Sequence, residues 1–227
     1  MNCSSDNLLT YCWFNNVLYI GTNSSEDENA IVNKQNLPAN LTLPSKYQGN
    51  PIEVIGFHAF SGCEKITELR LGRYVKIIED SAFRCAYSLR KIIIPPSVTF
   101  VGNYSIRTAF GNSSSNFGTL DVFFEPNSRL NYVGKYGISG AKYINIYYCS
   151  CRIPDVIANN FYYPGDTVKV FSSISFNFGR ISTIKKVTGM CNIHPFYEGF
   201  NCNCVSIYRS YSINSYLTKI IILFLVK

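Results

Sequence analysis

A motif that recurs after 23 residues constrains the fold of this chain more than any other feature. Repeats of this length are typical of proteins built from stacked supersecondary units. Six apolar or small positions share one register, which is not expected by chance. The matching pairs are Ile55 and Ile78, Ala59 and Ala82, Phe60 and Phe83, Ile66 and Leu89, Leu69 and Ile92, and Leu71 and Ile94.

Two less regular copies follow the first two. The third begins at Val101, contains the polar insertion 111–116, and resumes as an apolar strand over 120–124. The fourth extends from Leu130 to about Ile146. Ser105-Ile106 and Gly137-Ile138 stand where the first copies have Ala-Phe, so the recognisable repeats cover about residues 52–149.

The spacing within a copy predicts its local structure. Residues 69–71 and 92–94 alternate with a period of two, which predicts short strands with these apolar side chains inward. The Ala-Phe doublets are expected in a compact turn of helix, where the small alanine lets neighbouring coils approach. One coil cannot bury its own apolar edge, so stacked coils should place Phe60 and Phe83 in equivalent positions.

These residues resemble the BspA-like, or Treponema-type, leucine-rich repeat. The family's pattern appears as Ile55-Gly56, Ala59-Phe60, Cys63, Ile66, Leu69 and Leu71, and again from Ile78 to Pro95. The resemblance implies a leucine-rich-repeat solenoid, with short parallel strands and compact turns or short helices in each coil, and β-rich flanks. It also implies a surface protein that adheres to host or matrix proteins.

The chain divides into three parts on this basis. Residues 1–36 form an N-terminal cap or flank, which contains a strand-like run at 17–20. Residues 37–149 hold the BspA-like repeats. Residues 150–227 are strand-rich, with runs at 167–171 and 181–187, and two interpretations stay open for them: decayed repeats or a separate cap.

The residues that alternate with the inward set should line one outer surface, because successive strands lie side by side. Solenoids use such extended surfaces for recognition. Charged side chains mixed with exposed Ile, Phe and Tyr suit a protein interface. The predicted protein-binding residues are Glu68, Arg70, Lys91, Ile93, Asp121, Phe123, Asn145 and Tyr147. The register of the fourth copy is uncertain by one residue, which leaves an inward orientation of Asn145 and Tyr147 open.

Charge gives little support to a nucleic-acid partner. Residues 126–227 hold 11 basic and 3 acidic residues, but the basic ones are dispersed and accompany no recognition motif, so they are interpreted as solvated surface. The apolar run 220–226 is too short to cross a bilayer, which needs about 20 residues. It fits a buried strand or the start of an anchor, so membrane association stays open.

The sequence predicts no enzyme and no cofactor. It has two histidines, and His58 aligns with Ser81 at a variable turn position. A Ser-His-Asp arrangement needs a histidine held by a carboxylate beside a nucleophile. No nucleophile-elbow motif or phosphate-binding glycine loop occurs.

Nine cysteines leave at least one thiol unpaired. Cys63 and Cys85 follow the Phe of their copies and are expected as buried core residues. Five other cysteines could form disulfides in an extracellular protein; they are Cys149, Cys151, Cys191, Cys202 and Cys204. Alternatively, Cys191, Cys202 and Cys204 could bind zinc together with His194, although the C-x-C spacing departs from usual zinc sites.

We therefore expect a non-enzymatic protein-binding module at the cell surface or outside the cell, whose partner is a host matrix or cell-surface protein. N-glycosylation acceptor motifs support export weakly; they begin at Asn2, Asn23, Asn40, Asn103 and Asn112. The N-terminus lacks a clear signal peptide, so a cytoplasmic repeat scaffold with an endogenous partner is the alternative. A zinc-binding appendage and a decayed family member without activity are further alternatives.

Overall fold

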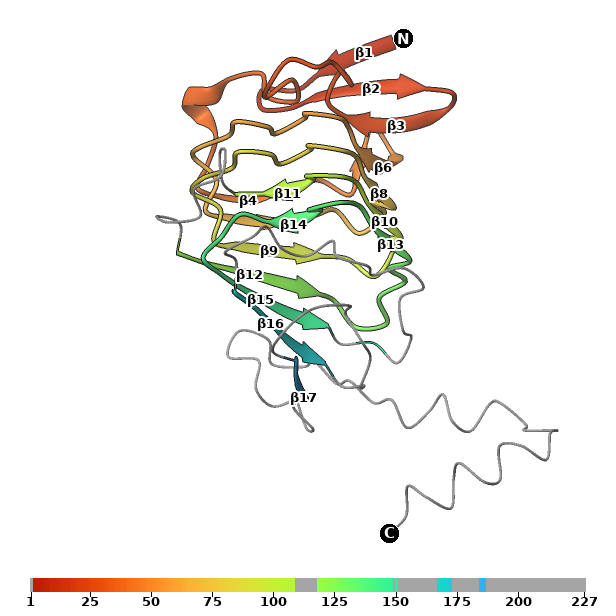
Figure 1. Ribbon diagram of the computed structural model, residues 1–227. Coiled ribbons are helices and arrows are strands. Elements are labelled where there is room, and N and C mark those ends of the chain that lie inside the picture. The colour runs from red at the N-terminus through yellow and green to blue at the C-terminus, as the bar shows by residue number, and fades with distance from the viewer. Residues whose placement is uncertain (1, 109–117, 149, 151–166, 173–183, 187–227) are drawn as a thin grey trace, which may run out of the picture.

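The chain stacks its strands in successive layers, as Figure 1 shows for the computed structural model. The structure describes residues 2–108, 118–148, 150, 167–172 and 184–186. Two long sheets run along the stack, and a two-stranded sheet lies between them on a third side. Among the described residues, helix is limited to the 3-10 turn η1 (Lys34–Asn36).

The eight-stranded sheet begins with the antiparallel strands of the N-terminus and continues with parallel ones. Its order is β1-β2-β3-β6-β8-β10-β13, and β5 pairs with β6. The bounds are β1 (Asn2–Ser5), β2 (Thr10–Phe14), β3 (Val17–Ile20), β5 (Lys46–Tyr47), β6 (Asn50–Ile55), β8 (Ile77–Ile78), β10 (Phe100–Val101) and β13 (Tyr132–Val133).

The seven-stranded sheet is parallel throughout, in the order β17-β16-β15-β12-β9-β7-β4. Its strands are β4 (Asn40–Thr42), β7 (Glu68–Arg70), β9 (Lys91–Ile94), β12 (Thr119–Phe124), β15 (Tyr143–Tyr148), β16 (Thr167–Ser172) and β17 (Ile184–Lys186). The two-stranded sheet pairs β11 (Ile106–Arg107) with β14 (Ile138–Ser139). The prediction of short parallel strands in a repeat fold is therefore confirmed.

Strand pairing follows the sequence repeat. The apolar position at the middle of β7 pairs with its counterparts in four successive strands, and all five side chains are buried because the core runs between the two long sheets. These residues are Leu69, Ile92, Val122, Ile146 and Val170. The strands β16 and β17 continue the same parallel pattern beyond the four copies recognised in the sequence.

Phe60 and Phe83 occupy equivalent places in adjacent coils, as the repeat predicts. Their rings stack with centroids 5.2 Å apart and an interplanar angle of 10°. The Phe60 amide donates to the Ala82 carbonyl, and the Phe83 amide donates to the Ser105 carbonyl, both over 2.7 Å. Aromatic stacking adds to the burial of these large side chains.

The compact turns expected at the Ala-Phe doublets are present, but the expectation that they are helical is wrong. The residue before each small residue takes a left-handed conformation, at His58, Ser81, Tyr104 and Tyr136 with φ from 53° to 57°. A residue in this conformation breaks a right-handed helix. The backbone amides that follow therefore bond to the next coil, which a helix would prevent.

The third and fourth copies keep the geometry of the first two despite their different residues. Ile106 and Ile138 continue the column of Phe60 and Phe83, and both are fully buried. The Ile106 amide donates to the Gly137 carbonyl over 2.7 Å. The column requires a bulky apolar residue beside a small one, not a particular pair.

Side chains also link the coils beside the eight-stranded sheet. The Asp80 carboxylate accepts from the Asn103 backbone amide over 2.7 Å, and Asn103 Oδ1 accepts from the Lys135 backbone amide over 2.7 Å. A Cβ on Gly102 would lie 2.3 Å from Asp80 Oδ1 and 2.5 Å from the Asp80 backbone nitrogen. Gly102 therefore allows the side chain of one coil to hold the backbone of the next.

The second copy has Glu79 where the third copy has Gly102, and the contact between coils explains this difference. In the first copy Phe57 stands where the second has Asp80, and its side chain has no oxygen to accept a backbone hydrogen bond. Instead, Glu79 Oε2 accepts from the Phe57 amide over 2.8 Å. Here the second coil supplies the acceptor to the first coil, whereas Asp80 accepts from the third.

The N-terminal strands extend the stack by one layer. β3 runs parallel to β6, and the Gly56 amide donates to the Ile20 carbonyl over 3.0 Å. The Ala30 amide likewise donates to the Ala59 carbonyl over 3.0 Å. Within the described ranges, no helix is long and apolar enough to cross a membrane; the insertion 111–116 and the run 220–226 lie outside the described residues.

We expect Gly102→Ala to destabilise the protein by about 1–3 kcal/mol, because the new methyl group meets the backbone and carboxylate of Asp80. Equilibrium urea unfolding measures the change. Gly118→Ala is the matched control, because the nearest atom to its Cβ is Arg90 Nε at 3.8 Å. Equal stability of the two variants would contradict the proposed close approach of the coils.

Candidate functional site

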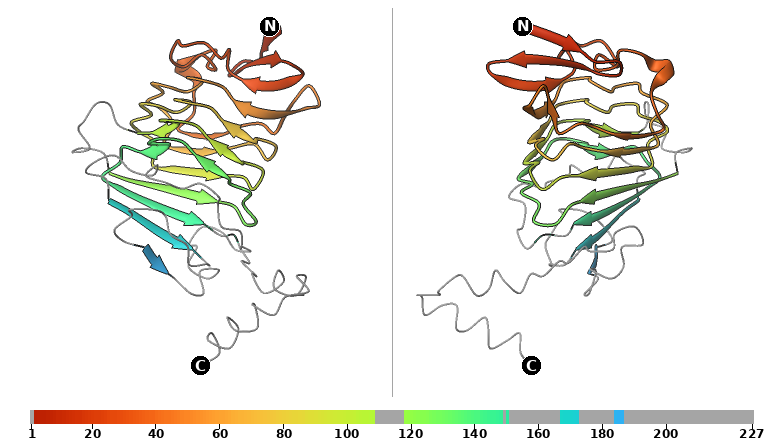
Figure 2. Two further views of the ribbon diagram at one scale, coloured as in Figure 1. Left: turned by 45° about the vertical axis from the view of Figure 1, so that its right-hand side comes forward. Right: turned by 180° about the vertical axis from the view of Figure 1, so that it is seen from behind.

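The eight predicted site residues lie in two rows on the outer face of the seven-stranded sheet. Figure 2 shows the ribbon of this sheet from two sides. The charged row is Glu68, Lys91, Asp121 and Asn145. The mixed row is Arg70, Ile93, Phe123 and Tyr147. Ile146 is fully buried on the opposite face, so Asn145 and Tyr147 point outward.

Members of the charged row pair with one another. Lys91 Nζ lies 3.2 Å from Glu68 Oε2 on the adjacent strand. Asn145 Nδ2 donates to Asp121 Oδ1 over 2.8 Å. Polar groups directly opposite on neighbouring strands stabilise the sheet in this way, so part of the charge of this face is neutralised within the protein.

The mixed row combines an ion pair with an aromatic stack. Arg70 Nη1 lies 2.6 Å from Glu125 Oε1, so the Arg70 side chain spans β9 to reach the end of β12. The rings of Phe123 and Tyr147 stack with centroids 4.4 Å apart. Arginine and tyrosine are the residue types that most often dominate binding energy at protein interfaces.

Two members of the mixed row are buried, although the sequence predicted that they are exposed. Only 7% of Ile93 and 5% of Phe123 is accessible. Ile93 lies between Arg70 and Phe123, and Arg70 crosses the strand that carries Ile93. Phe123 lies between Ile93 and Tyr147, whose ring stacks on it. These two side chains support the surface from beneath, whereas Arg70 and Tyr147 are partly exposed on it.

Tyr147 is a neutral phenol under ordinary conditions. Burial, and to a smaller extent the Asp121 carboxylate, raises the pKa of Tyr147. The half-buried ring offers an apolar edge, and the protonated hydroxyl group can act as a hydrogen-bond donor. The arrangement can bind a protein surface, and its contacts suggest no bond-breaking chemistry.

The other candidates from the sequence do not assemble into a second site of the predicted kinds. His58 Nδ1 lies 2.9 Å from Oδ1 of the exposed Asp27, and the His58 side chain itself is largely covered. Cys63 and Cys85 are buried free thiols, as predicted, and burial raises the pKa of the Cys63 thiol. The proposed zinc ligands between 191 and 204 lie outside the described residues, within which no group of three metal-binding side chains occurs.

One row on the outer face of the eight-stranded sheet was not predicted from the sequence. Val54, Ile77, Phe100 and Tyr132 pair in successive strands. The first three follow the 23-residue period, so the signal was present in the sequence. It was overlooked because the strands that carry these residues, apart from β6, are only two residues long and show no alternation.

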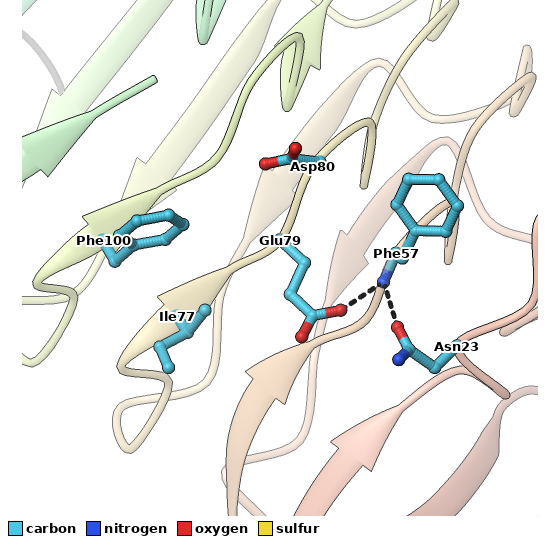
Figure 3. Close-up of a pocket in the computed structure, with 6 residues that line it drawn as sticks. All are labelled: Asn23, Phe57, Ile77, Glu79, Asp80 and Phe100. Carbon is cyan, nitrogen blue, oxygen red and sulfur yellow. Dashed lines mark hydrogen bonds between the residues drawn. The ribbon is translucent and has the colours of Figure 1, made fainter.

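A hollow of about 440 Å³ opens beside this row. Figure 3 shows the side chains that line it. Its lining residues are Asn23, Phe57, Ile77, Glu79, Asp80 and Phe100. The Glu79 side chain lies between Ile77 and Phe100 on one side and Phe57 and Asn23 on the other. Burial raises the pKa of Glu79, the hydrogen bond from the Phe57 amide lowers it, and neighbouring Asp80 raises it further, with a net upward shift.

This shift predicts a pH dependence of stability. The folded state binds a proton at Glu79 more tightly than the unfolded state, whose pKa is about 4.5. The stabilisation by the protonated carboxyl group is therefore complete below that value and is lost as the pH rises through the folded-state pKa. Glu79→Gln removes this titration, and its amide oxygen can still accept from Phe57.

We expect the stability of the wild type relative to Glu79→Gln to fall as the pH rises from about 4 to 7. Urea unfolding of both proteins at each pH measures it. A constant difference in unfolding free energy across this range, or a wild type that becomes more stable relative to the variant, would show that the pKa of Glu79 is not raised.

Comparison with known proteins identifies the repeat. The family model described as "BspA type Leucine rich repeat region" matches residues 33–163 in six copies, where inspection of the sequence recognised four. Among curated proteins no relative matches the chain. A leucine-rich repeat protein from Bacteroides ovatus matches among solved structures, with 14% identity, 80% of this chain and 76% of that chain covered, and a TM-score of 0.25.

The family match covers more than half of the chain and includes every strand of the seven-stranded sheet from β4 to β15. Leucine-rich repeats of this kind generally form a non-enzymatic protein-interaction fold. The regular strand register, the stacked Phe60 and Phe83 and the matching repeats lead to one conclusion: the chain belongs to the BspA-type leucine-rich-repeat family.

Proposed function

We propose that this protein is a surface or secreted recognition module that binds host or matrix proteins through the outer face of the seven-stranded sheet. Its coils form a solenoid, and the solenoid holds the two rows of side chains at fixed spacing. Neighbouring strands lie about 4.8 Å apart, so a partner meets a rigid array instead of flexible loops. Preorganisation of this kind reduces the entropic cost of binding.

The observation that carries the proposal is the mixed row. Tyr147 is fixed by its stack on Phe123, and Arg70 is fixed by its ion pair with Glu125. Both side chains therefore present large contact surfaces with few conformations left to lose. The paired residues of the charged row flank them and would form the polar rim of an interface.

The flanks fit a capped stack. We propose that residues 1–36 close one end, because β3 pairs with β6 and covers the apolar edge of the first coil. Residues 150–227 include β16 and β17, which pair in the register of the repeats, and this favours decayed repeats over a separate cap for that part.

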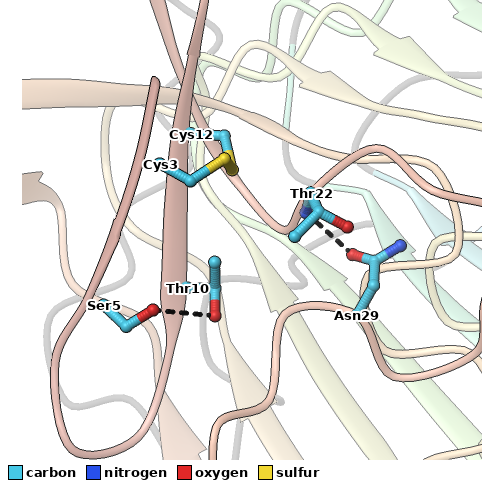
Figure 4. The surroundings of a disulfide bond; sticks show 6 residues. All are labelled: Cys3, Ser5, Thr10, Cys12, Thr22 and Asn29. Atoms are coloured by element: carbon cyan, nitrogen blue, oxygen red, sulfur yellow. Dashed lines mark hydrogen bonds between the residues drawn. A yellow bond between two sulfur atoms is a disulfide. The ribbon is translucent and has the colours of Figure 1, made fainter. Parts of the chain in front are cut away.

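A disulfide favours an exported protein over a cytoplasmic scaffold. Cys3 and Cys12 lie opposite each other on β1 and β2 and are bonded, close to the Ser5–Thr10 hydrogen bond (Figure 4). Disulfides persist in oxidising compartments and are rare in the cytosol. Proteins with BspA-type repeats are often surface-associated, which agrees with this inference.

Tyr147→Ala should reduce the affinity for a matrix partner by about thirtyfold, the loss expected when a central interface tyrosine is removed. Surface plasmon resonance with immobilised fibronectin, laminin and collagen measures it, using the full chain. The matched control is Tyr104→Ala, which removes a tyrosine whose ring lies 5.5 Å from that of Tyr136, outside both long sheets. Absence of binding to the whole panel, or an equal loss in both variants, would refute the proposed partner class or face.

Intact cells that make the protein should expose it to a membrane-impermeant biotin reagent, and alkylation before lysis should leave Cys3 and Cys12 protected as a disulfide. Mass spectrometry of the labelled and alkylated peptides measures both. A protein that is labelled only after lysis, with Cys3 and Cys12 both alkylated, would favour the intracellular scaffold.

A further inference from the structure

The hollow on the eight-stranded sheet is lined by residues that belong to or follow β3, β6, β8 and β10, and it combines apolar walls with two carboxylates. Phe57, Ile77 and Phe100 give it apolar walls, and Glu79 and Asp80 give it negative charge. Its volume of about 440 Å³ lies within the usual range of ligand pockets. Phe100 is held in place by its stack on Tyr132, with an interplanar angle of 9°.

The two carboxylates of the hollow differ from three other acidic groups on the outer faces of the sheets, which form ion pairs. Glu53 lies 2.7 Å from Lys76 Nζ, Glu68 lies 3.2 Å from Lys91 Nζ, and Glu125 lies 2.6 Å from Arg70 Nη1. In the part of the chain that the structure describes, neither Glu79 nor Asp80 lies within ion-pair distance of a basic side chain.

The polar contacts of these carboxylates leave room for a cation. Glu79 Oε2 accepts from the Phe57 amide over 2.8 Å, and this amide also donates to Asn23 Oδ1 over 3.0 Å. Asp80 accepts from the backbone and side chain of Asn103 over 2.7 Å and 2.9 Å. Both groups are fixed by backbone contacts, so they are preorganised, while no basic side chain among the described residues compensates the negative charge of Glu79.

We propose that this hollow receives the side chain of an arginine or lysine from a partner polypeptide. The methylene stem would lie along Ile77 and Phe100, and the charged head would reach the Glu79 carboxylate. Long basic side chains bury an apolar stem while keeping a charged head, and aromatic faces attract cations. An anionic ligand is disfavoured by the sign of the charge, and a neutral apolar ligand would cover Glu79 without compensating it.

The site is independent of the recognition surface on the seven-stranded sheet, so each can fail without the other. The probe is the blocked peptide acetyl-Gly-Ala-Arg-Ala-Gly-amide, with versions that carry lysine, citrulline or glutamate at the centre. NMR titration of the full chain follows the Ile77 δ-methyl resonance. We expect saturable shifts with the arginine or lysine peptide, and at least about tenfold weaker binding of citrulline, which has the shape of arginine without its charge.

Glu79→Gln should weaken the binding of the basic peptide about tenfold, because it removes the charge and retains the acceptor for Phe57. Glu53→Gln is the matched control: it neutralises an acid on the same face that already has Lys76, so binding should change less than about twofold. Tyr147→Ala should leave peptide binding unchanged, since this residue lies on the other sheet.

The proposal is overturned by any of three results. The first is the absence of a saturable Ile77 shift with both basic peptides. The second is equal binding of citrulline and arginine peptides, and the third is wild-type affinity in a folded Glu79→Gln variant. The citrulline comparison needs no substitution in the protein, so it remains decisive if Glu79→Gln does not fold.

Discussion

The structure depends on the contact between one coil and the next, in which backbone amides of each coil donate to carbonyls of its neighbour. The amides of Phe60, Phe83 and Ile106 make this bond at the same point of three successive coils, each over 2.7 Å. A coil on its own would leave these groups and its apolar edge exposed to water. Stacking satisfies both, so each coil is stable only beside another.

This contact also explains which positions vary. Ala59, Ala82, Ser105 and Gly137 are all small, because the backbone of the adjacent coil lies close to them. The neighbouring position can change from phenylalanine to isoleucine because it requires only apolar volume. Gly102 and Glu79 occupy one position in consecutive coils. Gly102 leaves room for the Asp80 side chain of the coil before it, and Glu79 accepts from the Phe57 backbone amide of the coil before it. Decay of the motif is therefore compatible with a continuous stack.

Regular stacking gives the two long sheets different outer surfaces. On the seven-stranded sheet, acidic and basic side chains pair across strands and surround a stacked Phe123 and Tyr147. On the eight-stranded sheet, the row that contains Ile77 and Phe100 borders carboxylates that have no basic partner among the described residues. The first surface suits a broad protein interface, and the second suits a single basic side chain, so the two sheets could engage different features of a partner.

Several features of the fold and the candidate site could be predicted from the sequence. The spacing of Leu69 and Leu71 gave the strand and its inward face, because alternation is a local property of a pleated chain. The same periodicity placed Glu68 and Lys91 in one row. The helical turn at Ala59-Phe60 was wrong, because the left-handed conformation of His58 is stabilised by the next coil and leaves no local signal.

The sequence by itself determined the repeat, the buried positions and the order of residues along each row, because these follow from spacing within the chain. The tertiary structure decided how much of each side chain reaches the surface. Ile93 and Phe123 are covered and Tyr147 is half-exposed, although all three point outward. It also brought Asn23, Phe57, Glu79 and Phe100 around one hollow. Exposure and cavities depend on the side chains of several coils at once, and no single segment of the sequence contains that information.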